Sequence, residues 1–90
     1  MIATWEDGLR LEFQVKRFPW WLTWWPSRNV TFGRTIYEGG PVGINDATLR
    51  HELQHVRQYH ERGWWWVWTH PRQREAEAHA AEQAAYPIWS

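Results

Sequence analysis

Hydrophobic and polar residues alternate strictly along the first part of the chain. The apolar residues are Leu9, Leu11, Phe13 and Val15, and the polar residues between them are Arg10, Glu12, Gln14 and Lys16. A period of two is typical of a half-buried β-strand, so we expect a strand over residues 9–17. Val30, Phe32 and Ile36 share one parity and predict a second strand over residues 29–37.

The pattern then changes to a helical period. Asn45 or Asp46 is a suitable N-cap, and we expect a helix from there to Arg62 that ends at Gly63. One face of this helix is apolar, as in an ordinary surface helix. A second face carries groups that can titrate or coordinate a metal, namely His51, Glu52, His55 and Tyr59.

A further helix is expected after an aromatic connection at residues 64–68. It runs from about Arg72 to Ala85, is rich in alanine and is ended by Pro87. Strands followed by two helices make an α+β fold, with a small N-terminal sheet. A chain of 90 residues is expected to form one domain, over residues 1–90.

Composition adds two constraints to this picture. The chain has no cysteine, so its stability must come from its ten tryptophans, from a metal or from association. Its formal net charge is zero with no basic block, which argues against nucleic acid as a partner. We find neither a signal peptide nor a membrane-spanning stretch, and therefore expect a cytoplasmic protein.

His51-Glu52-Leu53-Gln54-His55 is an HExxH motif on a predicted helix. Residues four apart project from one helix face, so the two imidazoles can bind one metal ion. Glu52 is placed to act on a water molecule rather than to bind the metal. Zinc suits two imidazoles and a carboxylate, with a fourth position left for water.

The competing interpretation is that both histidines are ordinary surface or core residues. The composition makes a chance HExxH match about 2 in 100, before a helix is required. The helical context lowers this further, so we favour the metal site.

The motif resembles that of the gluzincin metallopeptidases, whose third ligand is a glutamate on a later helix, often in a Glu-x-x-x-Asp pattern. Glu75-Ala76-Glu77-Ala78-His79 is similar, with His79 in the place of Asp. Residues 51–58 also resemble short phage and bacterial proteins of the minimal zincin kind, which is compatible with a phage-encoded protein. The resemblance covers roughly residues 45–86 and implies a zinc peptidase in which Glu75 is the third ligand.

Helical spacing by itself leaves the third ligand open. Glu75 and His79 share one face of the second helix, and Glu77 lies within the alanine-rich face. Glu77 would point at the metal if the alanine face packed on the first helix. We favour Glu75 because of the resemblance, with Glu77 and His79 as alternatives.

Two further roles are weaker expectations. Tyr86 or Tyr59 would donate a hydrogen bond to a developing oxyanion, and His79 would orient a metal ligand. The strand around residues 31–37 is either a structural edge or an edge with which a peptide substrate pairs.

Eight of the ten tryptophans occur in two clusters, at residues 20–25 and 64–68. Some are expected to fill the core, whereas exposed members would mark an oligomer contact, a protein partner or a membrane interface.

The sequence therefore predicts a zinc metallopeptidase that hydrolyses peptide or protein substrates, with His51, His55 and Glu75 as ligands and Glu52 as general base. The alternative is a non-catalytic component, for example of a phage particle, in which zinc only stabilises a zincin core. A Trp-rich binding module without metal would leave the HExxH spacing unexplained.

Overall fold

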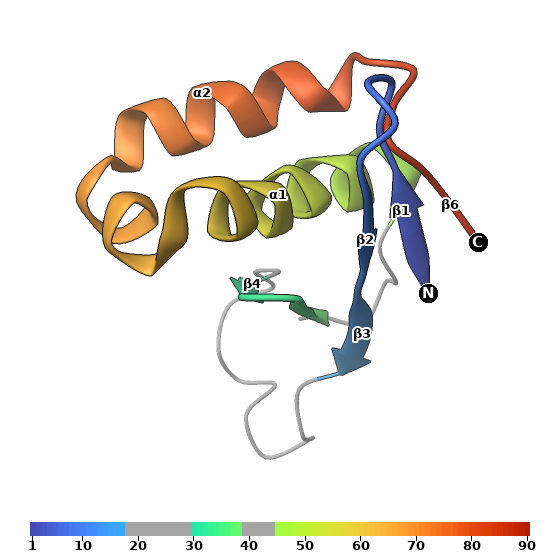
Figure 1. Ribbon diagram of the computed structural model, residues 1–90, viewed down its shortest axis with the longest axis horizontal. Helices are drawn as coiled ribbons and strands as arrows, with labels where there is room; N and C mark the ends of the chain where they lie inside the picture. Colours follow the sequence, from blue (N-terminus) through green and yellow to red (C-terminus); the bar gives the residue numbers. More distant parts are fainter. Residues whose placement is uncertain (18–29, 39–44) are drawn as a thin grey trace.

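The computed structural model describes residues 1–17, 30–38 and 45–90. It has the α+β fold that the sequence predicts, with short strands from the N-terminal half lying against two helices (Figure 1). The Trp cluster at residues 20–25 lies outside the described residues.

The first sheet joins the two ends of the chain. It contains β1 (Ile2–Thr4), β2 (Arg10–Glu12) and β6 (Ile88–Trp89), in the order β2-β1-β6 with antiparallel pairing. The backbone N–H of Ile2 donates to the carbonyl of Ser90 at 3.0 Å, which extends the pairing by one residue. The sequence pattern predicted neither β1 nor β6.

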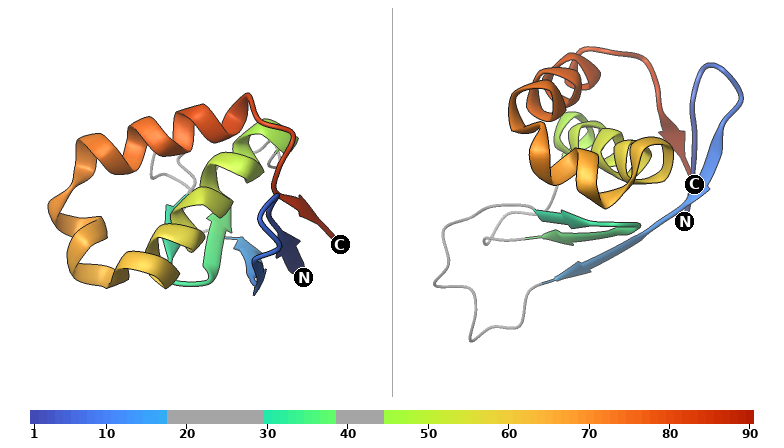
Figure 2. Two further views of the ribbon diagram at one scale, coloured as in Figure 1. Left: turned by 45° about the horizontal axis from the view of Figure 1, so that its top comes forward. Right: turned by 60° about the vertical axis from the view of Figure 1, so that its left-hand side comes forward.

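The second sheet lies beneath the helices (Figure 2). It contains β3 (Gln14–Arg17), β4 (Val30–Phe32) and β5 (Thr35–Glu38), in the order β3-β5-β4. β3 pairs with β5 in parallel, and β4 pairs with β5 in antiparallel orientation. β4 is therefore an outer strand of the sheet formed by the described residues.

The strand predicted over residues 9–17 is divided between the two sheets. The break falls at Phe13, whose N–H donates to Met1, whereas the next N–H, of Gln14, donates to Arg34. The alternation nevertheless holds across the break, because Leu11 and Phe13 are both buried and the polar neighbours are exposed.

The strand predicted over residues 29–37 is a hairpin instead of one strand. Gly33 has a positive φ of 59° and reverses the chain between β4 and β5. Thr31 consequently pairs with Ile36, and both are buried. The predicted common parity of Phe32 and Ile36 is wrong: the turn at Gly33 places them on opposite faces of the sheet, so Ile36 is buried and Phe32 is exposed.

The first helix, α1 (Asp46–Thr69), begins as predicted. The side chain of Asn45 caps it by accepting a hydrogen bond from the N–H of Thr48 at 2.8 Å. Gly63 breaks the helical geometry with φ 80° and ψ 173°, but the chain is helical again after it. The aromatic residues 64–68 therefore form a helical segment that bends away from the first part of α1, and the predicted connection is wrong.

The second helix, α2 (Pro71–Glu82), has its proline in the first turn and ends about one turn earlier than expected. It runs back along α1, so the two helices are antiparallel neighbours (Figures 1 and 2). Neither helix combines the length and apolar character needed to cross a membrane.

The hydrophobic core lies between the strands and α1. Its buried members are Ala3, Trp5, Leu11, Phe13, Ile36, Leu49, Leu53 and Val56. The described tryptophans divide between core and surface, because Trp5 is 5% exposed and Trp65 is 82% exposed. The apolar face of α1 is thus fixed against the sheets, which turns its histidine face toward α2.

Candidate metal centre

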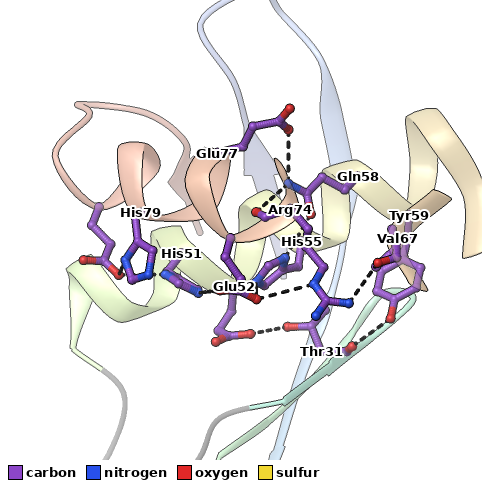
Figure 3. A network of polar contacts seen from close by, with 12 residues as sticks. Thr31, His51, Glu52, His55, Gln58, Tyr59, Val67, Arg74, Glu77 and His79 are labelled. Atoms are coloured by element: carbon purple, nitrogen blue, oxygen red, sulfur yellow. Dashed lines mark hydrogen bonds and ion pairs between the residues drawn. The ribbon is translucent and has the colours of Figure 1, made fainter. Parts of the chain in front are cut away.

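The histidines and Glu52 of the HExxH motif lie on the face of α1 that is turned toward α2 and β4 (Figure 3). Glu52 and His55 are buried, and the side chain of His51 is 14% exposed. The spacing of four residues brings the two imidazole rings together, with 5.0 Å between their centroids. The helix therefore presents two ring nitrogens to one point in space.

Glu75 of α2 meets these two rings. Its Oε2 lies 3.3 Å from Nε2 of His51, and its Oε1 lies 3.4 Å from Nε2 of His55. One ligand atom from each of the three residues falls within 4.8 Å of the others. The structure thus brings together the three residues that the sequence predicted as ligands.

The distances from Glu75 to the two Nε2 atoms are longer than ordinary hydrogen bonds. They exceed the usual 2.7–3.2 Å of an N–H···O hydrogen bond. Zinc binds imidazole nitrogen at about 2.0–2.1 Å and carboxylate oxygen at about 2.0–2.2 Å, so ligand atoms in a tetrahedral site are about 3.3 Å apart. The spacing of the three side chains is thus of the size that a zinc ion would need, with a different oxygen of Glu75 facing each ring.

Glu77 lies elsewhere. Its carboxylate pairs with Arg62, at 2.8 and 2.9 Å, and accepts a hydrogen bond from Gln58 at 3.1 Å. Burial by itself would raise the pKa of Glu77, but the hydrogen bonds from Arg62 and Gln58 and the charge of Arg62 lower it overall. Two residues turn a helix by about 200°, so Glu75 and Glu77 cannot both reach the histidines.

Each histidine has an oxygen partner on its other ring nitrogen. Nδ1 of His51 lies 2.7 Å from Oε1 of Glu82, and Nδ1 of His55 lies 2.9 Å from Oε1 of Gln58. Partners of this kind orient metal-binding imidazoles and fix their tautomer. Both Nε2 atoms are left to face Glu75.

The contacts of Gln58 determine the tautomer of His55. Nε2 of Gln58 donates to the carbonyl of Arg74 and to the carboxylate of Glu77, and both of these groups can only accept hydrogen bonds. The Oε1 end of Gln58 must therefore accept from Nδ1–H of His55. In the neutral ring, Nε2 then carries the lone pair that a metal needs. Burial lowers the pKa of His55, although Gln58 and the charge of Glu75 act in the opposite direction, so the ring favours its neutral form.

Glu52 is held by the neighbouring sheet. The hydroxyl of Thr31, on β4, donates to its Oε2 at 2.5 Å (Figure 3). Burial raises the pKa of Glu52, while the hydrogen bond from Thr31 and the charge of His51 act to lower it. A carboxyl group with a raised pKa is suited to take up and release a proton near neutral pH.

A cavity of about 580 Å³ opens in front of these residues. Its lining includes His51, Glu52, His55 and Glu75, together with Thr31, Phe32, Tyr59, Trp68, Arg74 and Glu82. The three ligand candidates and Glu52 therefore share one accessible space.

The two tyrosines considered as oxyanion donors are placed differently. Tyr59 lines the cavity, but its hydroxyl donates to the carbonyl of Thr31 at 3.2 Å. Burial raises the pKa of Tyr59, with opposing contributions from Arg74 and from a hydrogen bond with Trp68. Tyr86 lines a separate cavity beside Trp5, so the structure does not bring it to Glu52.

His79 lies on the outer side of the centre. Its ring centroid is 5.0 Å from that of His51, and its Nδ1 is 3.4 Å from Oε1 of Glu82. His51, His79 and Glu82 form a second group with metal-ligand atoms within 4.8 Å of one another. Among the described residues, His79 does not belong to the group of His51, His55 and Glu75.

Three residues of the centre were missed in the sequence. Gln58 follows His55 by three positions, so helical spacing could have indicated it. Glu82 follows Glu75 by seven positions, so helical spacing places it on the same face of α2. No sequence pattern indicated that Thr31 contacts Glu52, because the two residues are 21 positions apart.

No family model matches the sequence, and neither a curated protein nor a solved structure matches it. The resemblance to gluzincins therefore rests on the motif residues alone.

Proposed function

We propose that the protein is a zinc-dependent peptidase. His51, His55 and Glu75 hold the metal, and Glu52 is the general base. The observation that carries this proposal is the position of the Glu75 carboxylate, 3.3 and 3.4 Å from the two Nε2 atoms. Each separation, made by a different oxygen of the carboxylate, is close to the distance of about 3.3 Å between two ligand atoms of a tetrahedral zinc ion.

The number of ligands favours a catalytic site over a structural one. A structural zinc is usually closed by four protein ligands, whereas a catalytic zinc keeps one position open. The described residues supply three, and His79 belongs to the neighbouring group. A non-catalytic assembly component would also have no use for a buried Glu52 beside the ligands. The open site is thus the better account of the arrangement.

The chemistry divides between the metal and Glu52. A bound zinc ion would supply a Lewis acid and lower the pKa of a coordinated water molecule to about 7. Glu52 accepts a proton from the attacking water and later donates it to the leaving amine. Thr31 keeps the Glu52 carboxylate directed into the cavity through the 2.5 Å hydrogen bond.

Arg74 is our candidate for balancing the negative charge that develops on the substrate carbonyl. It lines the cavity, and its Nε lies 3.4 Å from Oε1 of Glu75. Its Nη1 donates to the carbonyl of Val67 at 2.8 Å, which holds the guanidinium in place. A fixed cation next to the reacting group can stabilise a developing oxyanion.

The outer strand β4 is our candidate for binding the peptide backbone. Thr31 and Phe32 of β4 line the cavity, and β4 pairs with β5 on its other side. An extended peptide could add to this edge as a further strand. Its scissile bond would then lie next to Glu52.

The test is peptide cleavage by zinc-loaded wild type and Glu52→Gln. Loss of a general base typically costs about 10²–10⁴-fold in rate. We expect Glu52→Gln to retain zinc and fold but to lose turnover to this extent. Glu61→Gln is the matched control, because Glu61 is exposed on the same helix and pairs with Arg57. Equal cleavage by wild type and Glu52→Gln would exclude the proposed role.

A further inference from the structure

Four aromatic side chains meet at one end of the cavity, where β4 approaches the bend of α1. We refer to Phe32, Tyr59, Trp64 and Trp68 as the aromatic wall. Phe32 stacks on Trp64 with 6.5 Å between ring centroids, and it lies 6.3 Å from Trp68. Tyr59 lies 4.6 Å from Trp64. The four rings therefore form one continuous apolar surface.

This surface is largely open to solvent. Phe32 is 41% exposed, Trp64 is 53% exposed and Trp68 is 59% exposed. Contiguous exposed aromatic surface is unfavourable in water and is typical of a binding site. Solitary exposure, as at Trp65, carries no such implication.

Two glycines hold the wall in place. Gly63 breaks α1, so that the following segment turns Trp64 and Trp68 toward Phe32 of β4. At Gly33 in the hairpin turn, an added Cβ would lie only 3.2 Å from Trp64, so the indole packs closely beneath the turn. The backbone conformation at Gly63 and Gly33 therefore helps to fix the position of the wall.

The wall belongs to the same cavity as the metal centre. Phe32, Tyr59 and Trp68 line it together with His51, His55 and Glu75. One side of the space thus offers polar and coordinating groups, and another offers aromatic faces. A peptide matches both sides, because its amide groups are polar and its side chains can be apolar.

We propose that the aromatic wall is a specificity subsite that binds a bulky aromatic side chain of a peptide, adjacent to the peptide group held at the metal centre. This inference rests on the proposed peptidase function for its biological meaning. Its occupant is defined by ring stacking, which aromatic pairs favour beyond the area that they bury.

The test measures binding, so that turnover is not required. Zinc-loaded Glu52→Gln protein is titrated by calorimetry with acetylated alanine pentapeptide amides that carry one Phe, placed at each position in turn. We expect one of these peptides to bind roughly tenfold or more tightly than the all-alanine peptide, as burial of an aromatic ring implies. The same Phe position should define the bond that wild type cleaves.

Substitutions in the wall then locate the effect. Trp68→Ala and Phe32→Ala, each made in the Glu52→Gln background, should reduce the Phe preference to near unity. Trp65→Ala is the control, because Trp65 lies on the same segment, is 82% exposed and does not line the cavity. It should leave the preference unchanged. A thermal melt of each variant identifies any loss of fold, and the two wall variants test the same claim independently.

The inference is overturned if all the peptides bind equally, or if the folded wall variants keep the Phe preference. It is also overturned if the wall variants abolish a concentration-dependent dimer of the wild type, since the wall would then be a contact between copies. A Phe preference that depends on Trp68, in a wild type that cleaves none of the peptides, would support the subsite and contradict the proposed peptidase function.

Discussion

At the scale of single residues, the centre depends on which nitrogen of each imidazole is free. Glu82 and Gln58 engage the Nδ1 atoms of His51 and His55, and this leaves both Nε2 atoms directed at Glu75. Loss of such an orienting partner typically lowers metal affinity about 10–100-fold. The arrangement therefore directs both Nε2 atoms to the place where the proposed metal ion would bind.

Glu75 and Glu77 of α2 provide a residue-scale prediction. Glu75→Gln removes a charged ligand, and we expect zinc affinity to fall at least as much as it does for lost orienting partners, about 10–100-fold. Glu77→Gln disturbs contacts with Arg62, Gln58 and Gln54 but leaves the carbonyl of Arg74 to hold Gln58, so zinc affinity should change little. Competition with a fluorescent zinc chelator measures both. The reverse ranking of the two variants would show that Glu77 is the ligand.

At the scale of elements, the bend in α1 connects the metal centre to the aromatic wall. Gly63 has φ 80° and ψ 173°, a region that residues with a side chain rarely adopt. Before it, α1 carries the histidines, and after it the chain carries Val67 and Trp68 into the cavity lining. The bend lets one helix supply two sides of the site.

Gly63→Ala tests the importance of this bend. No atom lies within 4 Å of the added Cβ, so the substitution acts through the backbone alone. We expect the free energy of unfolding to fall by about 1–3 kcal/mol, as measured by urea denaturation. Ala80→Gly, at an exposed position in α2, is the comparison and should cost less, about 0.5–1 kcal/mol. Equal stability of Gly63→Ala and wild type would contradict the strained geometry.

The helices were more predictable than the strands for a physical reason. The N-cap Asn45 and the breaks at Gly63 and Pro71 act within a few residues, so the sequence indicates them directly. At Phe13, by contrast, the chain passes from one sheet to the other. This depends on hydrogen bonds with backbone groups of Met1 and Arg34, of which Arg34 is distant in sequence. The Gly33 turn was overlooked because Val30, Phe32 and Ile36 continue one parity across it.

At the scale of the whole molecule, the site is assembled from three elements that pack together in the fold. α1 supplies the histidines and Glu52, α2 supplies Glu75, and β4 supplies Thr31. The HExxH spacing predicted the first set because it is local. It could not separate Glu75 from Glu77, since that choice depends on how α2 packs on α1. Thr31 depends on the hairpin register and was not predictable.

A metal that joins α1 to α2 should stabilise the whole chain. A ligand at a hundredfold excess over its Kd adds about 2.7 kcal/mol to the stability of the native state. In a domain of this size, each kcal/mol shifts Tm by about 4–8 °C. We therefore expect chelation to lower Tm by roughly 10–20 °C in a calorimetric scan, and zinc to restore it. An unchanged Tm after verified metal removal would show that the aromatic core suffices.

The central claim is that His51, His55 and Glu75 bind zinc, and metal analysis of the purified chain tests it most directly. We predict one zinc ion per chain for wild type and for Glu52→Gln, measured by mass spectrometry after dialysis against trace zinc. His51→Ala and His55→Ala should contain almost none, whereas His60→Ala, which alters an exposed histidine of the same helix, should match wild type. A wild-type protein without zinc, or histidine variants that retain it, would contradict the account.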